Sequence, residues 1–489
     1  MLEQIKALSK QSLIYGSGHI LARSISFLLL PLYTNVFTAR DYGVLSLAYA
    51  FMGFMAVALH YGLDAALMKW YVPADKEHRT RYLTTAYASY LITTGSFVAL
   101  MVGLRQLLAP ALLGEDYPHY IIYIAGILAC DILWYVPLLV LRSEERPLTY
   151  VIFSLLNVTG SLSLNLLLVL KYHMGVQGVL LTNLIMSGSL VVLTAPVLWR
   201  RLVPRDLSLK IWQQLMRFGL PFLPAGIFAM MMELADRYIL RALTDIATVG
   251  IYSAGYKLGM FMLLVVSGFN MGWHPFFLKQ EESPETRRLF ARVASYLLAA
   301  LGFIWILMTI WVPRLVRMDL GSFTFYGPEF WSGVGIVPLI ALGYMFDAAY
   351  LLQLPGVFRL GRSNWIAVTR STGALSNILL NFILIPYLGV TGAALATCCS
   401  FLLMAVFFYF VNRRLYPIHY EWGRLLRIAL LMAAIYALYQ LSSANVLWDA
   451  VLTILFPLGL LLSGFLNARE RSYLLVLIMP SRRRGQIRE

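Results

Sequence analysis

Fourteen apolar segments, separated by polar or charged joints, dominate this chain of 489 residues. Each is close to or longer than the roughly 20 apolar residues that an α-helix needs to cross a bilayer. They fall at about 12–36, 43–68, 82–108, 118–141, 148–170, 175–199, 214–241, 246–278, 288–312, 333–358, 365–387, 389–411, 425–442 and 446–466. Segments of this number and length predict an all-α integral membrane protein of about 14 transmembrane helices.

The composition agrees with a membrane protein and excludes an ordinary soluble domain. Hydrophobic residues make up 60% of the chain and charged residues 13%. The three cysteines, Cys130, Cys398 and Cys399, all lie within apolar segments. We therefore expect no disulfide framework, no metal site and no cofactor.

Two short patterns occur twice in the chain, in the same order. Gly43, Ser46 and Tyr49 recur 207 residues later as Gly250, Ser253 and Tyr256, and Gly175-Val-Gln-Gly178 recurs 214 residues later as Gly389-Val-Thr-Gly392. A repeat of about 210 apolar residues predicts two membrane lobes, as in many transporters. Because each lobe has six spans, both enter the membrane from the same side, and their pseudo-twofold axis runs along the membrane normal.

The repeat and the joints give four parts. The N-terminal lobe (helices 1–6) covers 1–200, a basic cytoplasmic linker covers 201–213, and the C-terminal lobe (helices 7–12) covers 214–412. Residues 413–489 supply helices 13 and 14 and a basic cytoplasmic tail. We expect a cavity between the two lobes, with the last two helices outside the repeat.

Positive charge predicts the orientation. With a cytoplasmic N-terminus and alternating joints, 30 of the 39 Lys and Arg residues fall at cytoplasmic joints or tails. Such a bias indicates a multi-pass protein with both termini in the cytoplasm. The net charge of +15 is spread over many joints, which argues against a nucleic-acid interface.

Three basic residues remain at membrane depth: Arg23, Arg237 and Lys257. A charge there costs about 2.5–3.5 kcal/mol on insertion scales, so it indicates function by default. Arg23 has no acidic neighbour at helical spacing, because positions 19, 20, 26 and 27 hold His, Ile, Ser and Phe. Its partner is then either an anionic ligand or a carboxylate of another helix. The planar guanidinium suits a phosphate as such a ligand.

The isolated carboxylates at membrane depth, Asp64, Asp131 and Asp347, are candidates for coupling transport to H⁺ or Na⁺. Asp131 and Asp347 stand in apolar surroundings. His60 lies four residues before Asp64, so the two predict either mutual hydrogen bonding or a proton site.

Glu233 and Asp236 lie close to Arg237 in the sequence. Glu233 is four residues away, the spacing of an ion pair that neutralises a helix. Arg237 can still face the cavity, because one guanidinium can bond a carboxylate and a ligand together.

Several stretches resemble one family. Ala235-Asp-Arg-Tyr-Ile-Leu240 and Val249-Gly-Ile-Tyr-Ser-Ala-Gly-Tyr-Lys257 are similar to the seventh and eighth helices of Wzx-type oligosaccharide-lipid flippases, and Phe27-Leu-Leu-Leu-Pro-Leu-Tyr-Thr34 with Asp41-Tyr-Gly43 is similar to their opening helices. Gly389-Val-Thr-Gly-Ala-Ala-Leu-Ala-Thr397 resembles a segment of the wider superfamily, which includes lipid II flippases and multidrug antiporters.

The resemblance implies a flippase of the bacterial inner membrane. Its substrate would be a polyprenyl-pyrophosphate-linked oligosaccharide for O-antigen, capsule or exopolysaccharide, moved by alternating access. Arg23, Arg237 and Lys257 would bind the pyrophosphate, and membrane lipids would surround the protein. A polysaccharide polymerase or a glycosyltransferase is a candidate partner.

Two other functions were weighed. A cation-coupled multidrug antiporter of the same superfamily is the alternative, although the basic residues speak against a cationic substrate. A membrane glycosyltransferase or polymerase needs catalytic carboxylates on a large external loop, and the longest candidate, 313–332, offers only Asp319 and Glu329. We therefore expect a transporter and not an enzyme.

Overall fold

The computed structural model describes residues 27, 29–144, 146–199, 201–319, 321, 324–362, 364–441, 445–467 and 470. These residues form helices joined by short turns, with one isolated β-bridge between Asp319 and Thr324. Ten of the described helices are long and apolar enough to cross a membrane, and an eleventh span results if one bent pair is counted as a single span. The expected all-α membrane fold is confirmed.

The first group of helices follows a helical stretch at 29–36. It comprises α2 (Ala39–His60), α3 (Leu63–Tyr71), α4 (Lys76–Gly103), α5 (Arg105–Leu113), α6 (Pro118–Ser143), α7 (Pro147–Asn165) with the π-helix η1 (Leu166–Lys171), and α8 (Gly175–Trp199). Helix α6 packs against α4 and α8. We call this group the N-lobe.

The second group, the C-lobe, comprises α10 (Phe222–Leu243), α11 (Ile246–Gly259), α12 (Phe261–Lys279), α13 (Pro284–Val316), the 3₁₀ helix η3 (Pro328–Ile336), α14 (Val337–Leu351), α15 (Leu354–Arg359) and α16 (Asn364–Leu415). Gly389 has φ 52° and ψ −126°, so it divides the 52-residue α16 into two helices. This break coincides with the boundary expected between the segments 365–387 and 389–411.

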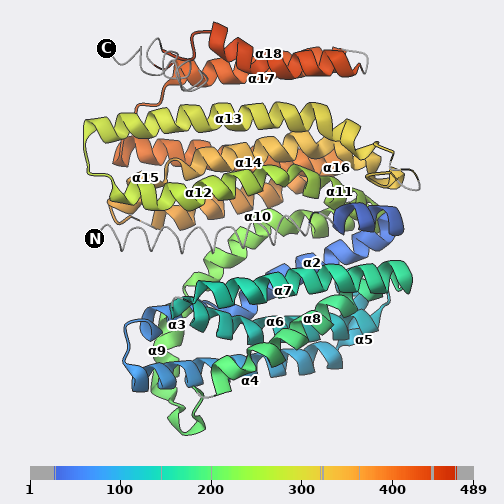
Figure 1. Ribbon diagram of the computed structural model, residues 1–489, viewed down its shortest axis with the longest axis vertical. Coiled ribbons are helices and arrows are strands. Elements are labelled where there is room, and N and C mark those ends of the chain that lie inside the picture. Colours follow the sequence, from blue (N-terminus) through green and yellow to red (C-terminus); the bar gives the residue numbers. More distant parts are fainter. Residues whose placement is uncertain are drawn as a thin grey trace, which may run out of the picture.

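Three further elements lie outside these groups. The 3₁₀ helix η2 (Pro204–Asp206) and α9 (Leu209–Gly219) connect the lobes, and α9 packs on α3 and α4 of the N-lobe. Helices α17 (Trp422–Leu441) and α18 (Val446–Leu462) pack on α13. Figure 1 shows the N-lobe below, the C-lobe above it, and α17 and α18 at the far side of the C-lobe.

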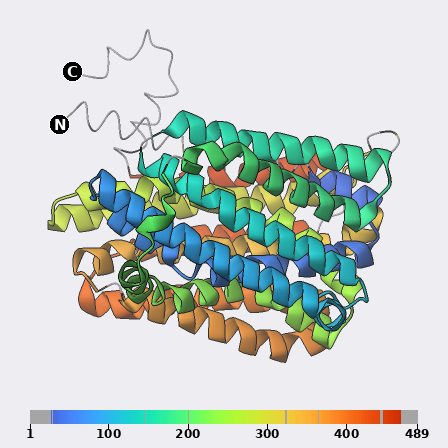
Figure 2. The same cartoon turned by 90° about the horizontal axis from the view of Figure 1, so that it is seen from below.

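The long helices run side by side, as Figure 2 shows, so the bundle has two ends. One end carries the basic connections that precede α4, α9 and α13, and we call it the basic end. The opposite end carries the start of α2 and the start of η3, and we call it the latch end. In Figure 1 the basic end is on the left.

Two predicted spans are bent near the basic end. The segment 43–68 is divided between α2 and α3, because Tyr61 and Gly62 adopt positive φ angles of 34° and 72°. The segment 214–241 is divided by a bend of 45° between α9 and α10. The two bends are in backbone contact, because a Cβ on Gly62 would overlap the carbonyl oxygen of Gly219.

The repeated glycines explain how the lobes meet at the latch end. A Cβ on Gly43 would overlap the carbonyl oxygen of Ile246, and a Cβ on Gly250 would overlap that of Ala39. Ile246 follows Ala39 by the same 207 residues that separate the glycines. Helices α2 and α11 are therefore in backbone contact through a pseudo-symmetric pair, which closes the space between them at this end.

A second contact at the latch end joins the C-lobe to the residues just before α2. Residues 324–330, here called the latch, lie against the helical stretch 29–36 and the first residue of α2. Asn35 Nδ2 donates to the carbonyl oxygen of Thr324 (2.9 Å), the amide of Gly327 donates to Thr34 Oγ1 (3.2 Å), and the amide of Ala39 donates to Glu329 Oε1 (3.0 Å). The C-lobe thus holds the N-lobe by three hydrogen bonds.

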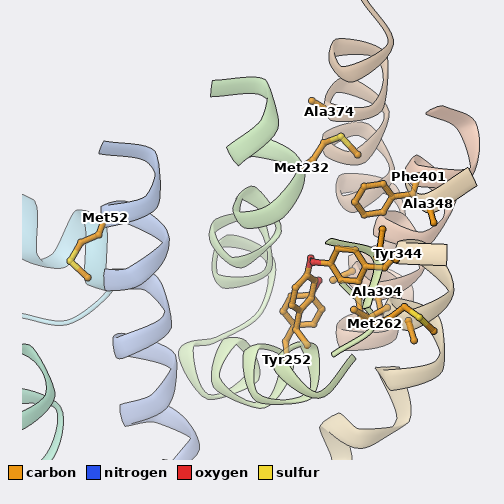
Figure 3. Close-up of a cluster of buried hydrophobic side chains, with 14 of the residues drawn as sticks. Met52, Met232, Tyr252, Met262, Tyr344, Ala348, Ala374, Ala394 and Phe401 are labelled. Carbon is orange, nitrogen blue, oxygen red and sulfur yellow. The ribbon is translucent and has the colours of Figure 1, made fainter. Parts of the chain in front are cut away.

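The apolar core of the C-lobe lies on the side of α11 that faces away from α2. Figure 3 shows Tyr252, Tyr344 and Phe401 gathered there, with Met232 nearby and Met52 apart on α2. The rings of Tyr344 and Phe401 are 5.7 Å apart. This core fixes the face of α11 that does not touch α2.

Candidate functional site

A cavity of about 640 Å³ lies between the N-lobe and helices α10 and α11. Its volume is within the range typical of ligand sites, about 300–1,000 Å³. Both copies of the repeat line it, through the equivalent pairs Ser46 and Ser253, and Tyr49 and Tyr256. The glycine of each copy therefore makes the contact between the lobes, while the serine and tyrosine face the cavity.

The C-lobe wall of the cavity carries Arg237. Its Nη1 lies 2.8 Å from Asp236 Oδ1, and the same nitrogen donates to the main-chain carbonyl of Glu233. Tyr252 donates its hydroxyl to the other oxygen of Asp236, and the guanidinium lies 4.7 Å from the ring centre of Tyr256. These contacts fix the guanidinium at the edge of the cavity.

Lys257 lies on the same wall and is held differently. It forms no ion pair with any residue that the structure describes, and its Nζ is 5.6 Å from the ring centre of Tyr42. The hydroxyls of Tyr42 and Ser253, which line the cavity too, are buried without a hydrogen-bond partner among the described residues. Buried polar groups are normally bonded, so a cation and two hydroxyls here suit an anionic ligand.

Asp131 lies on the opposite, N-lobe wall. Its Oδ1 accepts hydrogen bonds from Ser187 Oγ (2.6 Å) and Trp134 Nε1 (3.0 Å). Both donors are neutral, so the carboxylate has no cationic partner in the described part of the chain.

Asp347 lies in a separate pocket of about 240 Å³ inside the C-lobe. Arg370 Nη1 is 3.2 Å from Asp347 Oδ1, and Glu233 lines the same pocket. Arg370 lies near the start of the apolar segment 365–387, and it is one of the 30 basic residues expected at cytoplasmic joints. Its buried partner could not be recognised from the sequence because it lies on another helix.

His60 and Asp64 are separated by the break between α2 and α3, so they do not share one continuous helix. The ring of His60 lies 4.7 Å from that of Tyr135, and its Nδ1 has no hydrogen-bond partner among the described residues. Neither residue lines the cavity between the lobes.

The structure therefore brings Arg237, Lys257 and Asp131 to one cavity, with Arg237 ion-paired to Asp236 and bonded to the main-chain carbonyl of Glu233. Arg23 lies outside the described residues, as does the tail beyond Glu470. Sequence reasoning missed the polar residues of the N-lobe wall, among them Asn157 and Asn183. Uncharged amides on apolar helices carry no signal comparable to that of a buried charge.

A family model described as "Polysaccharide biosynthesis protein" matches residues 8–281, more than half of the chain. An "Uncharacterized membrane protein" of Haemophilus influenzae is 20% identical over 395 residues, which cover 79% of this chain and 94% of the relative.

Two solved structures have the same fold. One is titled "Lipid II flippase MurJ, inward closed conformation" (TM-score 0.68, 14% identity, 96% of this chain and 100% of that chain). The other is an inward-facing multidrug resistance MATE family transporter of the MOP superfamily (TM-score 0.66, 14% identity, 80% of this chain and 94% of that chain). At this identity the likeness establishes the fold alone.

Proposed function

Because the chain belongs to the polysaccharide biosynthesis protein family, we propose that it is a flippase for polyprenyl-pyrophosphate-linked oligosaccharides. It would act in the bacterial inner membrane by alternating access, for the synthesis of O-antigen, capsule or exopolysaccharide. The basic end would face the cytoplasm, in line with the positive-inside rule.

The observation that carries this proposal is the cationic wall of the cavity. Lys257 has no carboxylate partner in the described residues, and Arg237 lies beside it on α10. Charge-assisted hydrogen bonds to phosphate oxygens are about twice as strong as neutral ones. A pyrophosphate would offset the cost of keeping an unpaired ammonium at membrane depth. Arg23 remains a third candidate ligand, on the physical argument from its sequence neighbours.

The alternative, a cation-coupled multidrug antiporter, has the same fold as the MATE transporter. A cationic drug would meet Arg237 and Lys257 in the cavity, and like charges oppose binding. For coupling to H⁺ or Na⁺, Asp64, Asp131 and Asp347 stay candidates. Asp347 is the weakest of them for a metal ion, since Arg370 already neutralises it.

The test is transport in proteoliposomes of defined lipid composition, with a labelled polyprenyl-pyrophosphate oligosaccharide and with a cationic dye. We expect the glycolipid to be moved and the dye not. Lys257→Gln should slow glycolipid transport by roughly 10-fold or more, the effect of losing one hydrogen bond to a charged group, and Lys257→Arg should retain most of it. Lys279→Gln, at the exposed end of α12, is the matched control. Efflux of the dye alone would favour the antiporter.

A further inference from the structure

The two walls of the cavity differ in chemistry as well as in charge. The C-lobe wall presents the cations Arg237 and Lys257. The N-lobe wall presents one carboxylate, Asp131, and three amides, Asn157, Asn165 and Asn183, and no cation among its described residues. The repeat therefore produced two surfaces that suit different parts of one ligand.

Asn165 is bonded at both polar atoms, to Tyr33 and to the carbonyl oxygen of Ser161, whereas Asp131, Asn157 and Asn183 are each held by one polar atom and have another available. Asp131 accepts both of its hydrogen bonds at Oδ1, so Oδ2 accepts none from a described residue. Asn183 donates Nδ2 to Tyr49 (2.9 Å), so its Oδ1 remains available, and Asn157 accepts from Ser161 at Oδ1 (3.4 Å), so its Nδ2 remains available. Side chains fixed in this way are preorganised to bind a ligand.

Two of the available atoms, Asp131 Oδ2 and Asn183 Oδ1, do not suit a phosphate. A phosphate oxygen accepts hydrogen bonds, so it finds no donor at either atom and is repelled by the carboxylate. A sugar hydroxyl both donates and accepts, so it can bond to Asp131 Oδ2, Asn183 Oδ1 and Asn157 Nδ2 alike. Tyr49 adds an aromatic surface with an apolar face on the same wall.

We propose that the N-lobe wall is a sugar subsite, in which Asp131, Asn157 and Asn183 hydrogen-bond the hydroxyls of a neutral sugar attached to the pyrophosphate. The inference rests on the proposed function, and it adds the residues that bind the sugar part of the substrate. The pyrophosphate lies on the C-lobe wall, and the glycan lies across the cavity from it. A site built to bond a hydroxyl discriminates strongly against a ligand that lacks it.

The experiment compares two probes in proteoliposomes. One is polyprenyl pyrophosphate without sugar, and the other is the same lipid carrying a neutral oligosaccharide. Asn157→Ala should lower transport of the glycosylated lipid roughly 10-fold relative to the sugar-free lipid. Asp131→Asn, which replaces a charged acceptor by an amide, should lower this ratio by less, and Lys257→Gln should lower transport of both lipids. Asp131→Asn keeps the acceptor for Ser187 and Trp134, so the fold should be retained. Thr159→Ala, exposed on the same helix as Asn157, is the control.

The outcomes separate this inference from the proposed function. Equal losses for the two lipids would overturn the sugar subsite and leave the flippase standing. Loss of dependence on an imposed H⁺ or Na⁺ gradient in Asp131→Asn, for both lipids, would make Asp131 a coupling carboxylate and overturn its role here. Wild-type protein that moves neither lipid would overturn both proposals.

Discussion

The two lobes share a repeated scaffold but hold their carboxylates in different ways. In the N-lobe, Asp131 accepts hydrogen bonds from the neutral groups of Ser187 and Trp134. In the C-lobe, Asp236 and Asp347 are each paired with an arginine, Arg237 at 2.8 Å and Arg370 at 3.2 Å.

The difference shows where the duplication diverged. Ala50 of α2 stands at the position that Lys257 occupies in α11, and both line the cavity. The C-lobe therefore carries a cation where the N-lobe carries an alanine, while the glycine, serine and tyrosine of the repeat are the same in both. Because a paired carboxylate is already neutralised, the positive charge left over for a ligand lies on the C-lobe wall at Lys257.

The largest effect that tests this comparison should come from Arg237→Gln. It leaves Asp236 buried without its cation, which typically costs about 3–5 kcal/mol. Ser187→Ala in the N-lobe should cost less, about 1–3 kcal/mol, because Asp131 keeps Trp134 and was never ion-paired. Unfolding of the purified variants in detergent gives both values.

The double variant Asp236→Asn/Arg237→Gln is the control for the first effect. Removing both charges should recover much of the lost stability, since no unpaired charge remains. If the double variant is as unstable as Arg237→Gln, Arg237 does not stabilise the protein through its ion pair with Asp236.

A smaller and symmetric effect is expected from the repeated glycines. Gly43→Ala and Gly250→Ala each place a methyl group against a carbonyl oxygen of the opposing helix, and overpacking typically costs about 1–3 kcal/mol. The two losses should agree to within about 0.5 kcal/mol, because the contacts are related by the repeat. Gly95→Ala, where an added Cβ has open space, is the control. Clearly unequal losses would show that the interface is not symmetric in energy.

The smallest effect concerns how the helices of the repeat begin. Both helices have a local cap: Thr38 Oγ1 accepts from the amide of Asp41 at 3.1 Å in α2, and Asp245 accepts from the amide of Thr248 at 2.8 Å in α11. Helix α2 is also held by the latch at Glu329. Asp245→Ala should cost about 1 kcal/mol and Asp245→Asn very little, because asparagine caps equally well.

The pH dependence of this cap follows from its hydrogen bonds. The amide of Thr248 lowers the pKa of Asp245 below its ordinary value of 3.8. The stabilisation is therefore present above pH 3.8 and is lost as the pH falls through the lowered pKa. The stability gap between wild type and Asp245→Ala should narrow below that pH, and a gap independent of pH would contradict the assignment.

Much of the fold follows from the sequence because its signals are local. Apolar length gives the spans, and the same Gly389 that belongs to the repeat separates the two halves of α16. The repeat itself predicts two lobes. The repeat does not predict which residue each glycine contacts, because the contact of Gly43 with Ile246 joins residues about 200 positions apart.

The site was predictable only in part, for reasons of geometry. Lys257 and Arg237 stand out as charges in apolar segments, and both line the cavity. For Arg237 the sequence predicted an ion pair within its own helix, with Glu233 or Asp236, and the structure pairs it with its neighbour Asp236. The predicted interaction of His60 with Asp64 rested on a continuous helix, and Tyr61 and Gly62 interrupt that helix.

The latch has a consequence for populations. Its three hydrogen bonds, at about 1 kcal/mol each, would favour the state closed at this end by on the order of 100-fold over a state in which they are broken. A ligand that binds the open state about 100-fold more tightly would offset this contribution. The short segment 324–330 thus adds a bias toward the closed end that a single bound substrate can cancel.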